Sequence, residues 1–255
     1  MAFPLMRSLV EAAEMAMTKQ YRKRVSRRIY AELGGEVRYG PFKGLRLEDG
    51  SHISDGPLAL KVLGLYEQEL LDEITARPVQ TLVNMGGADG YYSVGMLRAD
   101  LAERSIAFEM DPAGRETIAR NAKANGVADR ITVLEKATED WAARVLELDV
   151  DPARTLVLCD IEGMEFELIT PEAVAALPGA SYMIELHHAL VPDGETKLER
   201  LQAALEPTHR TQVLRSGPPR WSGIAEVEAL RDLERALVTS QGRKMIGEWM
   251  VARPR

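Results

Sequence analysis

The sequence predicts an α/β protein with a doubly wound, mostly parallel sheet and a helical N-terminal extension. From about residue 80 onward, short apolar or β-branched segments typical of buried parallel strands alternate with helical stretches. The 255 residues, 45% hydrophobic and 28% charged, suffice for one large domain or two small ones and do not have the composition of a disordered chain. The five strand segments are TLVN (81–84), SIAFE (105–109), ITVLE (131–135), TLVLCD (155–160) and SYMIEL (181–186).

Residues 1–77 precede the first strand and are predicted to form the helical extension. Apolar residues recur at every fourth position from Leu5 to Leu33, which places one apolar stripe along a long helix, and Gly34-Gly35 ends it. Two short strand-like pieces around turn signals at 40–44 are predicted to form a hairpin, and residues 57–74 one further helix. We expect this extension to act as a lid or an oligomer contact.

Residues 78–255 are predicted to form the sheet domain. Its best-marked helix begins at Asp111-Pro112, an N-cap followed by proline at the first helical position. Two more helices are predicted over 195–206 and 224–238 from their apolar faces, and the tail over 247–254 is predicted to supply a last strand.

The net charge of −7, with a pI near 5.3, argues against a general nucleic-acid-binding protein. The basic cluster from Lys19 to Arg28 is interpreted as a solvated helix face; an anionic substrate or a partner surface, such as a homodimer contact through this helix, stays open. We expect no membrane span or signal peptide, because Arg7, Glu11 and Glu14 interrupt the first apolar stretch. The sole cysteine, Cys159, excludes an internal disulfide and a cysteine-built metal site, and suits a cytoplasmic location.

The first predicted strand runs into a glycine-rich turn, NMGGADGYYS, at residues 84–93. In open α/β sheets such a turn makes room for a nucleotide, because glycines such as Gly86 and Gly90 let the backbone approach a ligand and the following helix offers free N–H groups. The dinucleotide fingerprint is not met, since Met85 stands where its first glycine should be. The turn therefore lacks a tight pyrophosphate cradle, and a bare turn without a ligand remains an alternative.

The second predicted strand ends at an acidic residue, Glu109, in the segment AFEMDP. Glu109 follows the glycine turn by about twenty residues, a position from which a carboxylate accepts hydrogen bonds from both hydroxyls of a ribose. A helix-capping or surface carboxylate is the alternative. Turn and acid together predict a ligand that contains a ribose and lacks a pyrophosphate.

Carboxylates and a histidine follow the fourth and fifth predicted strands, in LVLCDIEGME and YMIELHH. Alternation along the fifth strand places Glu185 and His187 on one face, so that the carboxylate could orient the imidazole as a general base. We therefore take His187 and Asp160 as candidate bases and Glu185 as the positioning residue. The same three side chains are acceptable ligands for Mg²⁺ or a transition metal, but the sequence alone leads us to assign no metal site.

Four of these segments, in their order and spacing, resemble the FkbM-type branch of the class I S-adenosylmethionine-dependent methyltransferases. They are LVNMGGADGYYS, AFEMDP, LVLCDIEGMEFELI and MIELHH, and the resemblance covers about residues 78–215. It implies a Rossmann-like domain with S-adenosyl-L-methionine as the cofactor: the glycine turn on the methionine part, Glu109 on the ribose, and Ala137 and Thr138 beside the adenine. The implied cofactor-binding residues are Asn84, Gly86, Gly90, Tyr91, Glu109, Met110, Ala137, Thr138 and Asp160.

Two positions depart from that pattern. The family usually has aspartate at the position of Asn84 and alanine at the position of Gly87. Asn84 cannot form an ion pair with the ammonium group of the cofactor, so affinity could fall, or Asp89 could supply the carboxylate. The segments PFKGLRL and LGLYEQEL are similar to N-terminal extensions of bacterial members, which would place Tyr66 and Glu67 in a lid.

The sequence thus predicts a methyltransferase that methylates an oxygen of a small molecule or glycoside, the oxygen being implied by the resemblance alone. Two alternatives stay open. One is a methyltransferase-like protein that binds a nucleoside without catalysis, which the neutral Asn84 allows. The other is an NAD-dependent oxidoreductase, which the missing pyrophosphate spacing disfavours.

Overall fold

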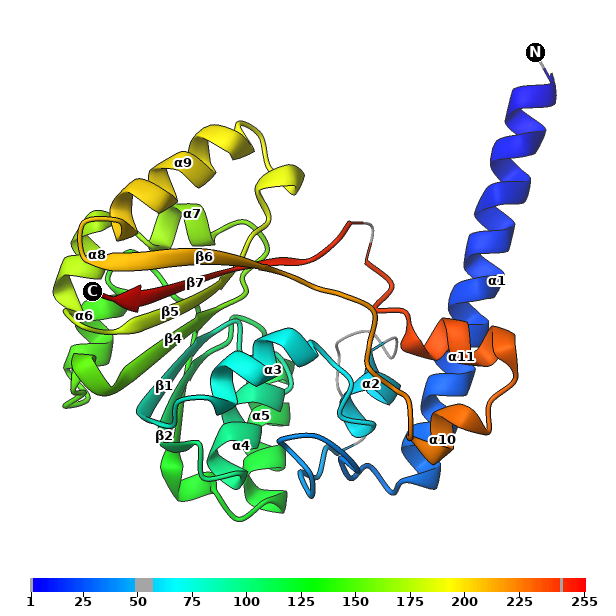
Figure 1. Cartoon of the computed structure of the whole chain (residues 1–255), viewed down its shortest axis with the longest axis horizontal. Coiled ribbons are helices and arrows are strands. Elements are labelled where there is room, and N and C mark those ends of the chain that lie inside the picture. The colour runs from blue at the N-terminus through cyan, green and yellow to red at the C-terminus, as the bar shows by residue number, and fades with distance from the viewer. Residues whose placement is uncertain (1, 49–56, 244) are drawn as a thin grey trace.

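A mixed β-sheet forms the centre of the molecule (Figure 1). The computed structural model describes residues 2–48, 57–243 and 245–255, with side chains from residue 13 onward. Within these residues the sheet has seven strands in the order β3-β2-β1-β4-β5-β7-β6, and β7 runs antiparallel to both of its neighbours. The strands are β1 Val79–Met85, β2 Ala102–Phe108, β3 Ile131–Leu134, β4 Thr155–Cys159, β5 Ser181–Glu185, β6 His209–Arg215 and β7 Glu248–Pro254.

The predicted fold class is confirmed, and so are the five predicted parallel strands and the strand in the tail. Strand β6 is not predicted from the sequence. This strand lies at the edge of the sheet and pairs only with β7 among the described residues. Of its residues only His209 is buried, and Val213 is 46% exposed, so β6 lacks the apolar run or alternation that marks the buried strands.

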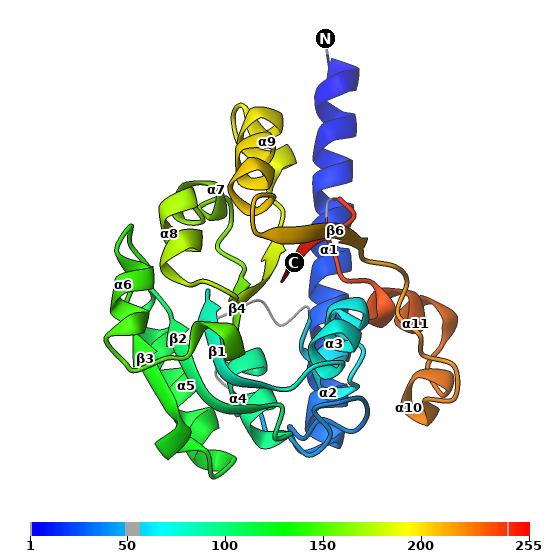
Figure 2. The same ribbon diagram turned by 60° about the vertical axis from the view of Figure 1, so that its left-hand side comes forward.

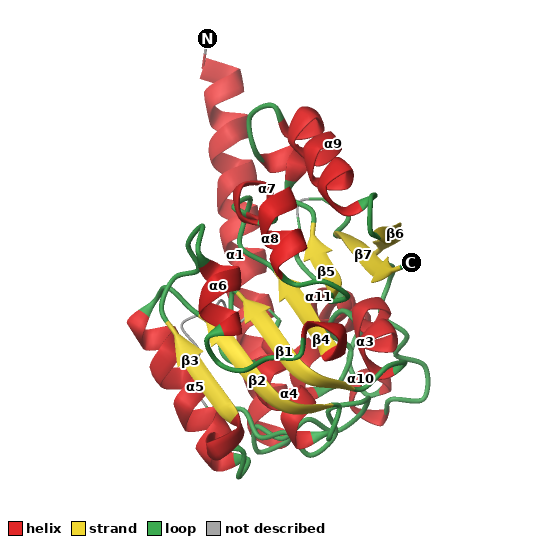
Figure 3. Cartoon of the chain, turned by 90° about the vertical axis from the view of Figure 1, so that its left-hand side faces the viewer, coloured by secondary structure: helices red, strands yellow, loops and turns green. Residues whose placement is uncertain are grey.

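Helices cover both faces of the sheet, as Figure 3 shows. Side chains of β1 and β4 alternate between two cores: Leu82 and Leu158 pack in the core beneath α4, whereas Val83 and Val157 pack in the core beneath α6, α8 and α9. This two-sided burial explains the continuous apolar strands. The helices are α1 Ala2–Glu32, α2 Leu58–Val62, α3 Gln68–Thr75, α4 Tyr91–Arg98, α5 Pro112–Ala124, α6 Trp141–Leu146, α7 Glu165–Leu168, α8 Pro171–Ala176, α9 Gly194–Leu205, α10 Ala225–Glu228 and α11 Asp232–Thr239.

The helix predicted to begin at Asp111-Pro112 is confirmed as α5. The Asp111 side chain accepts a hydrogen bond from the Ala113 amide at 3.0 Å, which satisfies one of the free N–H groups of the first turn. The helix predicted over 195–206 is confirmed as α9.

The prediction of a single helix over residues 57–74 is wrong. The chain forms α2 and α3, separated by a turn in which Gly64 has a φ of +67°. A Cβ at Gly64 would lie 2.0 Å from the carbonyl oxygen of Tyr39, so this turn packs directly against the preceding loop. The apolar spacing continues across the turn, which is why the pattern resembles one helix.

The prediction of a single helix over residues 224–238 is also wrong, because the chain forms α10 and α11. The guanidinium of Arg235 donates to the carbonyl oxygens of Glu228 and Leu230, at 3.3 and 2.8 Å. These bonds satisfy carbonyl groups that a continuous helix would otherwise pair with its own amides.

The predicted hairpin after the first helix is very short. A single antiparallel bridge joins Glu36 to Arg46, and the Val37 amide donates to the Leu45 carbonyl at 2.8 Å. The two strand-like pieces are therefore a tight loop rather than part of the sheet.

The first predicted helix is confirmed as α1, which projects well beyond the body of the molecule (Figures 1 and 2). Its apolar stripe is buried only near its C-terminal end: Val25 and Ile29 are each 1% exposed, whereas Met17 is 72% exposed. Leu5 and Leu9 of the same stripe lie outside the residues whose side chains are described. No helix in the described part of the chain is both long enough and apolar enough to cross a membrane.

A carboxylate on α11 fixes α1 to the C-terminal part of the chain. Glu234 accepts hydrogen bonds from the Tyr21 hydroxyl and from the guanidinium groups of Arg28 and Arg231, each at 3.2 Å. The hydrogen bond from Arg231, reinforced by Arg28, lowers the pKa of Glu234 to about 2. Part of the basic cluster of α1 therefore has a structural role.

We expect Glu234→Gln to lower the melting temperature most at neutral pH. The folded-state pKa of about 2 lies below the ordinary value of 4.5, so the ionised carboxylate stabilises the fold fully above pH 4.5, and this stabilisation is lost as the pH falls toward 2. Thermal unfolding between about pH 7 and about pH 3 should show the difference from the wild type shrinking with acid. Glu195→Gln, which changes an exposed carboxylate on α9, is the control, and a pH-independent difference for Glu234→Gln would contradict the expectation.

Candidate functional site

A cavity of about 430 Å³ opens where β1, β2 and β4 end, a volume in the range of small-molecule sites. Parallel strands end at one edge of a sheet, so the residues that follow them converge there. Seven of the nine cofactor residues predicted from the sequence line this cavity; they are Asn84, Gly86, Tyr91, Glu109, Met110, Ala137 and Asp160.

The other two predicted residues, Gly90 and Thr138, lie just outside the lining. Gly90 is the N-cap of α4, with a φ of +81°, and its amide donates to the Gly87 carbonyl at 2.8 Å. The Thr138 hydroxyl donates to Asp140, and Lys136 lines the cavity in its vicinity. Gly90 thus shapes the turn, while Thr138 is occupied within its own loop.

Two glycines bring the turn after β1 close to its neighbours. Gly86 has a φ of +88°, and a Cβ there would lie 1.9 Å from the carbonyl oxygen of Asp160. A Cβ at Gly87 would lie 2.9 Å from Cδ1 of Ile118 on α5. Only glycine fits at Gly86, whereas an alanine at position 87 would require only the end of the Ile118 side chain to shift.

Glu109 joins the glycine turn to the end of β2. Its Oε2 accepts a hydrogen bond from the Ala88 amide at 2.7 Å, and its Oε1 accepts one from the Asp111 amide at 2.8 Å. The carboxylate also lines the cavity, and each of its oxygens retains a lone pair for a ligand hydroxyl. The structural and the ligand-binding roles considered from the sequence are therefore compatible.

A buried ion pair forms part of the cavity wall. Lys61 Nζ lies 2.5 Å from Asp89 Oδ2, and the two side chains are 6% and 4% exposed. Lys61 Nζ also lies 5.4 and 5.3 Å from the ring centroids of Tyr66 and Tyr91, within cation–π range. A positive and a negative group thus stand side by side at the glycine turn.

Asn84 is buried at the end of β1, and its Nδ2 donates to the Ser93 hydroxyl oxygen at 2.9 Å. The Tyr91 hydroxyl, from the first turn of α4, is buried and has no hydrogen-bond partner among the described residues. Tyr91 lines the cavity as a residue, while its hydroxyl itself is enclosed by protein.

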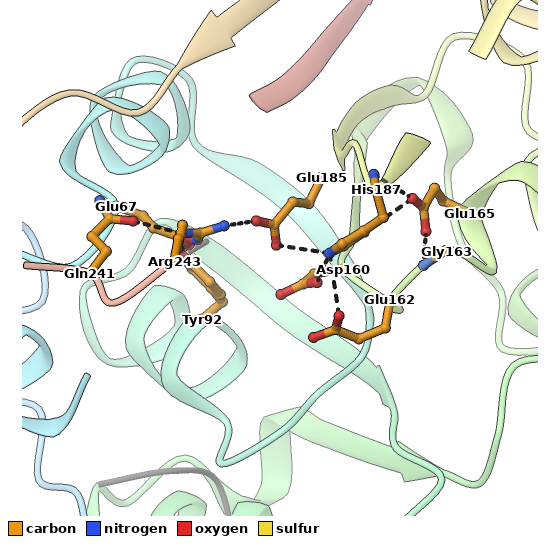
Figure 4. A network of polar contacts seen from close by, with 10 residues as sticks. All are labelled: Glu67, Tyr92, Asp160, Glu162, Gly163, Glu165, Glu185, His187, Gln241 and Arg243. Atoms are coloured by element: carbon orange, nitrogen blue, oxygen red, sulfur yellow. Dashed lines mark hydrogen bonds and ion pairs between the residues drawn. The ribbon is translucent and has the colours of Figure 1, made fainter. Parts of the chain in front are cut away.

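Glu165, and not Glu185, orients the imidazole of His187 (Figure 4). One oxygen of Glu165 lies 3.1 Å from His187 Nδ1 and accepts from the His187 amide at 2.9 Å. The other oxygen accepts from the Gly163 amide at 2.8 Å, so the carboxylate is fixed on both sides. The predicted orienting role of Glu185 is therefore wrong, because Glu185 lies near the opposite ring nitrogen, Nε2.

Three carboxylate oxygens surround His187 Nε2. The distances are 3.7 Å to Asp160 Oδ1, 3.6 Å to Glu162 Oε2 and 3.9 Å to Glu185 Oε2. Burial alone lowers the pKa of His187, but the hydrogen bond to Glu165 and the surrounding carboxylates outweigh it and raise the pKa. Enclosure raises the pKa of Asp160 against the opposing effect of His187.

Arg243 closes the other side of this cluster from the loop between α11 and β7. Its guanidinium forms ion pairs with Glu185 and with Glu67, and its Nε donates to Gln241 at 2.8 Å. Glu67, which is 1% exposed, also accepts a hydrogen bond from the Tyr92 hydroxyl. Tyr66 and Glu67, predicted to lie in a lid, thus lie at the cavity and beside the cluster.

Three charged residues of the site are not predicted from the sequence: Lys61, Glu165 and Arg243. A lysine within the apolar run ALKVLGL is unusual in a buried helix and could have pointed to Lys61. Nothing marks Arg243, because its partners lie 58 and 176 positions away in a chain whose 217–244 segment carries no motif.

No family model matches this chain. The release factor glutamine methyltransferase of Cereibacter sphaeroides is 33% identical over 126 residues, which are 49% of this chain and 41% of that protein. The chain thus spans well under two thirds of that relative.

Solved structures share the fold at low identity. Cofactor-bound Rv0187 from MTB has a TM-score of 0.51 and 17% identity, covering 74% of this chain and 79% of its own. The O-methyltransferase from Bacillus cereus in complex with SAH has a TM-score of 0.51 and 13% identity, covering 75% and 80%. The O-methyltransferase TomG from Streptomyces achromogenes, involved in tomaymycin synthesis and solved with SAM, has a TM-score of 0.50 and 15% identity, covering 71% and 76%. The chain therefore shares the α/β fold of these three structures.

We expect Lys61→Met to lower the free energy of unfolding by about 3–5 kcal/mol, because the Asp89 carboxylate would stay buried without its partner. The double variant Lys61→Met/Asp89→Asn should recover part of this loss, since both charges are then removed. Chemical denaturation measures both effects, with Lys43→Met, at an exposed lysine, as the control. A double variant less stable than Lys61→Met would contradict this account of the pair.

Proposed function

We propose that the protein is an S-adenosylmethionine-dependent methyltransferase that methylates an oxygen of a small molecule or glycoside. One observation carries the proposal: a single cavity joins the glycine turn and Glu109 to the carboxylates Asp160 and Glu162 that face His187. The first group suits a ribose-containing cofactor and the second suits removal of a proton. The methyltransferase relatives and the shared fold support the same proposal.

The residues present fit the cofactor. Its methionine end carries an ammonium and a carboxylate, and the buried pair of Asp89 and Lys61 offers one group of each opposite sign. Glu109 would accept hydrogen bonds from the ribose hydroxyls, and Met110 and Ala137 would flank the adenine.

When bound, S-adenosylmethionine supplies a methyl group on a sulfonium leaving group, and the side chains then have two tasks. The cavity walls align the acceptor oxygen with the methyl carbon and exclude water, which accounts for much of the rate in such a displacement. The cluster around His187 takes the acceptor proton, with His187 and Asp160 as the candidate bases. Glu165 positions the imidazole, and Arg243 positions Glu185.

The finer assignments rest on the sequence. The motifs D-I-E-G-M-E and I-E-L-H support the FkbM-type branch, and the single cysteine supports a cytoplasmic location. A homodimer through α1 is supported by the exposed Met15 and Met17 on the projecting part of that helix. Of the two rivals, the oxidoreductase draws no support from the relatives, and the inactive binding protein is tested by turnover below.

Glu109→Ala should weaken binding of S-adenosylhomocysteine by about 1.5–3 kcal/mol, the scale of charge-assisted hydrogen bonds. Isothermal titration calorimetry measures the change. Glu135→Ala is the matched control, because Glu135 also follows a strand and is 83% exposed. The melting temperature of Glu109→Ala without ligand shows whether the variant stays folded after the hydrogen bond between Glu109 and the glycine turn is lost.

Two outcomes would count against this part of the proposal. Unchanged affinity in a folded Glu109→Ala variant would mean that the ribose lies elsewhere. Binding of NAD by the wild type, without binding of S-adenosylhomocysteine, would reject the methyltransferase in favour of the oxidoreductase.

His187→Ala should lower turnover by roughly 10²- to 10⁴-fold, the scale of losing acid–base assistance, while S-adenosylhomocysteine affinity stays nearly constant. Release of S-adenosylhomocysteine is the readout, after an acceptor has been found by screening small hydroxylated compounds. His188→Ala, at the neighbouring imidazole outside the cluster, should retain turnover. Full turnover in His187→Ala would transfer the role of base to Asp160, and no turnover with any acceptor despite tight cofactor binding would favour the inactive binding protein.

A further inference from the structure

Among the described residues, Nε2 of His187 has no hydrogen-bond partner. With Nδ1 engaged by Glu165, Nε2 faces oxygens of Asp160, Glu162 and Glu185 at 3.6 to 3.9 Å. Hydrogen bonds from nitrogen to oxygen are about 2.7–3.2 Å long, so these groups approach Nε2 without bonding to it. His187 and Glu185 are 8% and 4% exposed and enclose one side of this gap, whereas Asp160 and Glu162 lie on its solvent side.

The spacing suits an ion in the gap. Metal–ligand bonds to histidine nitrogen and carboxylate oxygen are about 2.0–2.2 Å, so neighbouring ligands lie about 3 Å apart and opposite ligands about 4 Å apart. One ligand atom from each of Asp160, Glu185 and His187 lies within 4.8 Å of the others. Each of these three ligand atoms would have to move by less than about 1 Å to contact one ion.

The two buried ligands are also held from behind, as ligands of a built site are. Glu165, which is fully buried, fixes the far nitrogen of His187. Arg243 engages Oε1 of Glu185 and leaves Oε2 directed at the gap. Metal-bound histidines commonly donate their second N–H to a carboxylate, which fixes both the tautomer and the ring orientation.

We propose that Asp160, Glu185 and His187 bind a divalent transition-metal ion. A nitrogen donor among carboxylates favours ions such as Mn²⁺, Fe²⁺ or Zn²⁺ over Mg²⁺ and Ca²⁺, which prefer oxygen ligands alone. Glu162 is 85% exposed and lies 3.6 Å from Nε2, so it flanks the ion on the solvent side.

The ion site adjoins the cavity, because Asp160 and Glu162 line both. This inference deepens the proposed function and rests on it for its chemical role. The ion would bind the acceptor oxygen and ease loss of its proton to a nearby carboxylate, with His187 serving as ligand in place of base. Binding of the ion itself requires neither cofactor nor acceptor.

The test uses the full chain after treatment with a chelator. Mn²⁺ is titrated and the free ion is followed by electron paramagnetic resonance. We expect one Mn²⁺ per chain, displaced by Zn²⁺, which N/O sites bind more tightly. His187→Ala and Asp160→Asn should each weaken binding more than about 100-fold, and Glu165→Gln about 10- to 100-fold through the orientation of the imidazole. His188→Gln is the matched control and should bind as the wild type does.

Two results would overturn the site: no saturable Mn²⁺ or Zn²⁺ binding up to millimolar concentration, or binding that His187→Ala and Asp160→Asn leave unchanged. Circular dichroism tests whether each variant is folded. If His187→Ala does not fold, Asp160→Asn provides the test in its place. Titration of the same samples with S-adenosylhomocysteine reports on the proposed function separately. Binding of S-adenosylhomocysteine without binding of Mn²⁺ would reject the ion and leave the methyltransferase proposal standing.

Discussion

The close approach of Gly86 to the carbonyl of Asp160 is the contact on which the site depends. The Asp160 amide donates to the Met85 carbonyl at 3.0 Å. This hydrogen bond keeps the pairing of β1 and β4 intact up to Met85, the last residue of β1. A Cβ at Gly86 would lie 1.9 Å from the Asp160 carbonyl oxygen, so no other residue permits this junction. The two chain segments then leave the sheet in different directions at the point where the strand order reverses, and the cavity lies between them.

Charges buried at this edge are balanced by side chains that come from outside the parallel strands. Lys61 reaches Asp89 from α2, and Arg243 reaches Glu185 from the loop before β7. Leaving either carboxylate buried and unpaired would cost several kcal/mol, so each depends on a cation supplied from outside the parallel strands. Residues of the N-terminal extension and of the C-terminal loop therefore form part of the site.

The sequence predicts those parts of the molecule that follow from local pattern. Apolar strands locate the sheet, and the residues that end those strands, such as Glu109 and Asp160, are assigned to one edge by the strand–helix alternation alone. The orientation of His187 by Glu165 could not be predicted, because strand alternation relates only residues on the same strand and Glu165 lies 22 positions away. The break between α2 and α3 escapes prediction for a similar reason, since a distant backbone contact at Gly64 imposes it.

Asn84 is neutral at the position where the resembled family usually has an aspartate, the carboxylate that would meet the ammonium of a methionine-containing cofactor. The structure places Asp89 in the same cavity wall, where Oδ1 accepts from the Tyr91 amide and Oδ2 pairs with Lys61. Asn84 instead donates to Ser93, which ties the end of β1 to α4 without adding a second buried charge. Under the proposed function, the ammonium and the carboxylate of the cofactor would pair with Asp89 and Lys61. The net charge of the cavity wall would therefore not change. In that case Asp89 supplies the carboxylate in place of residue 84, and the neutral Asn84 is no sign that function is lost.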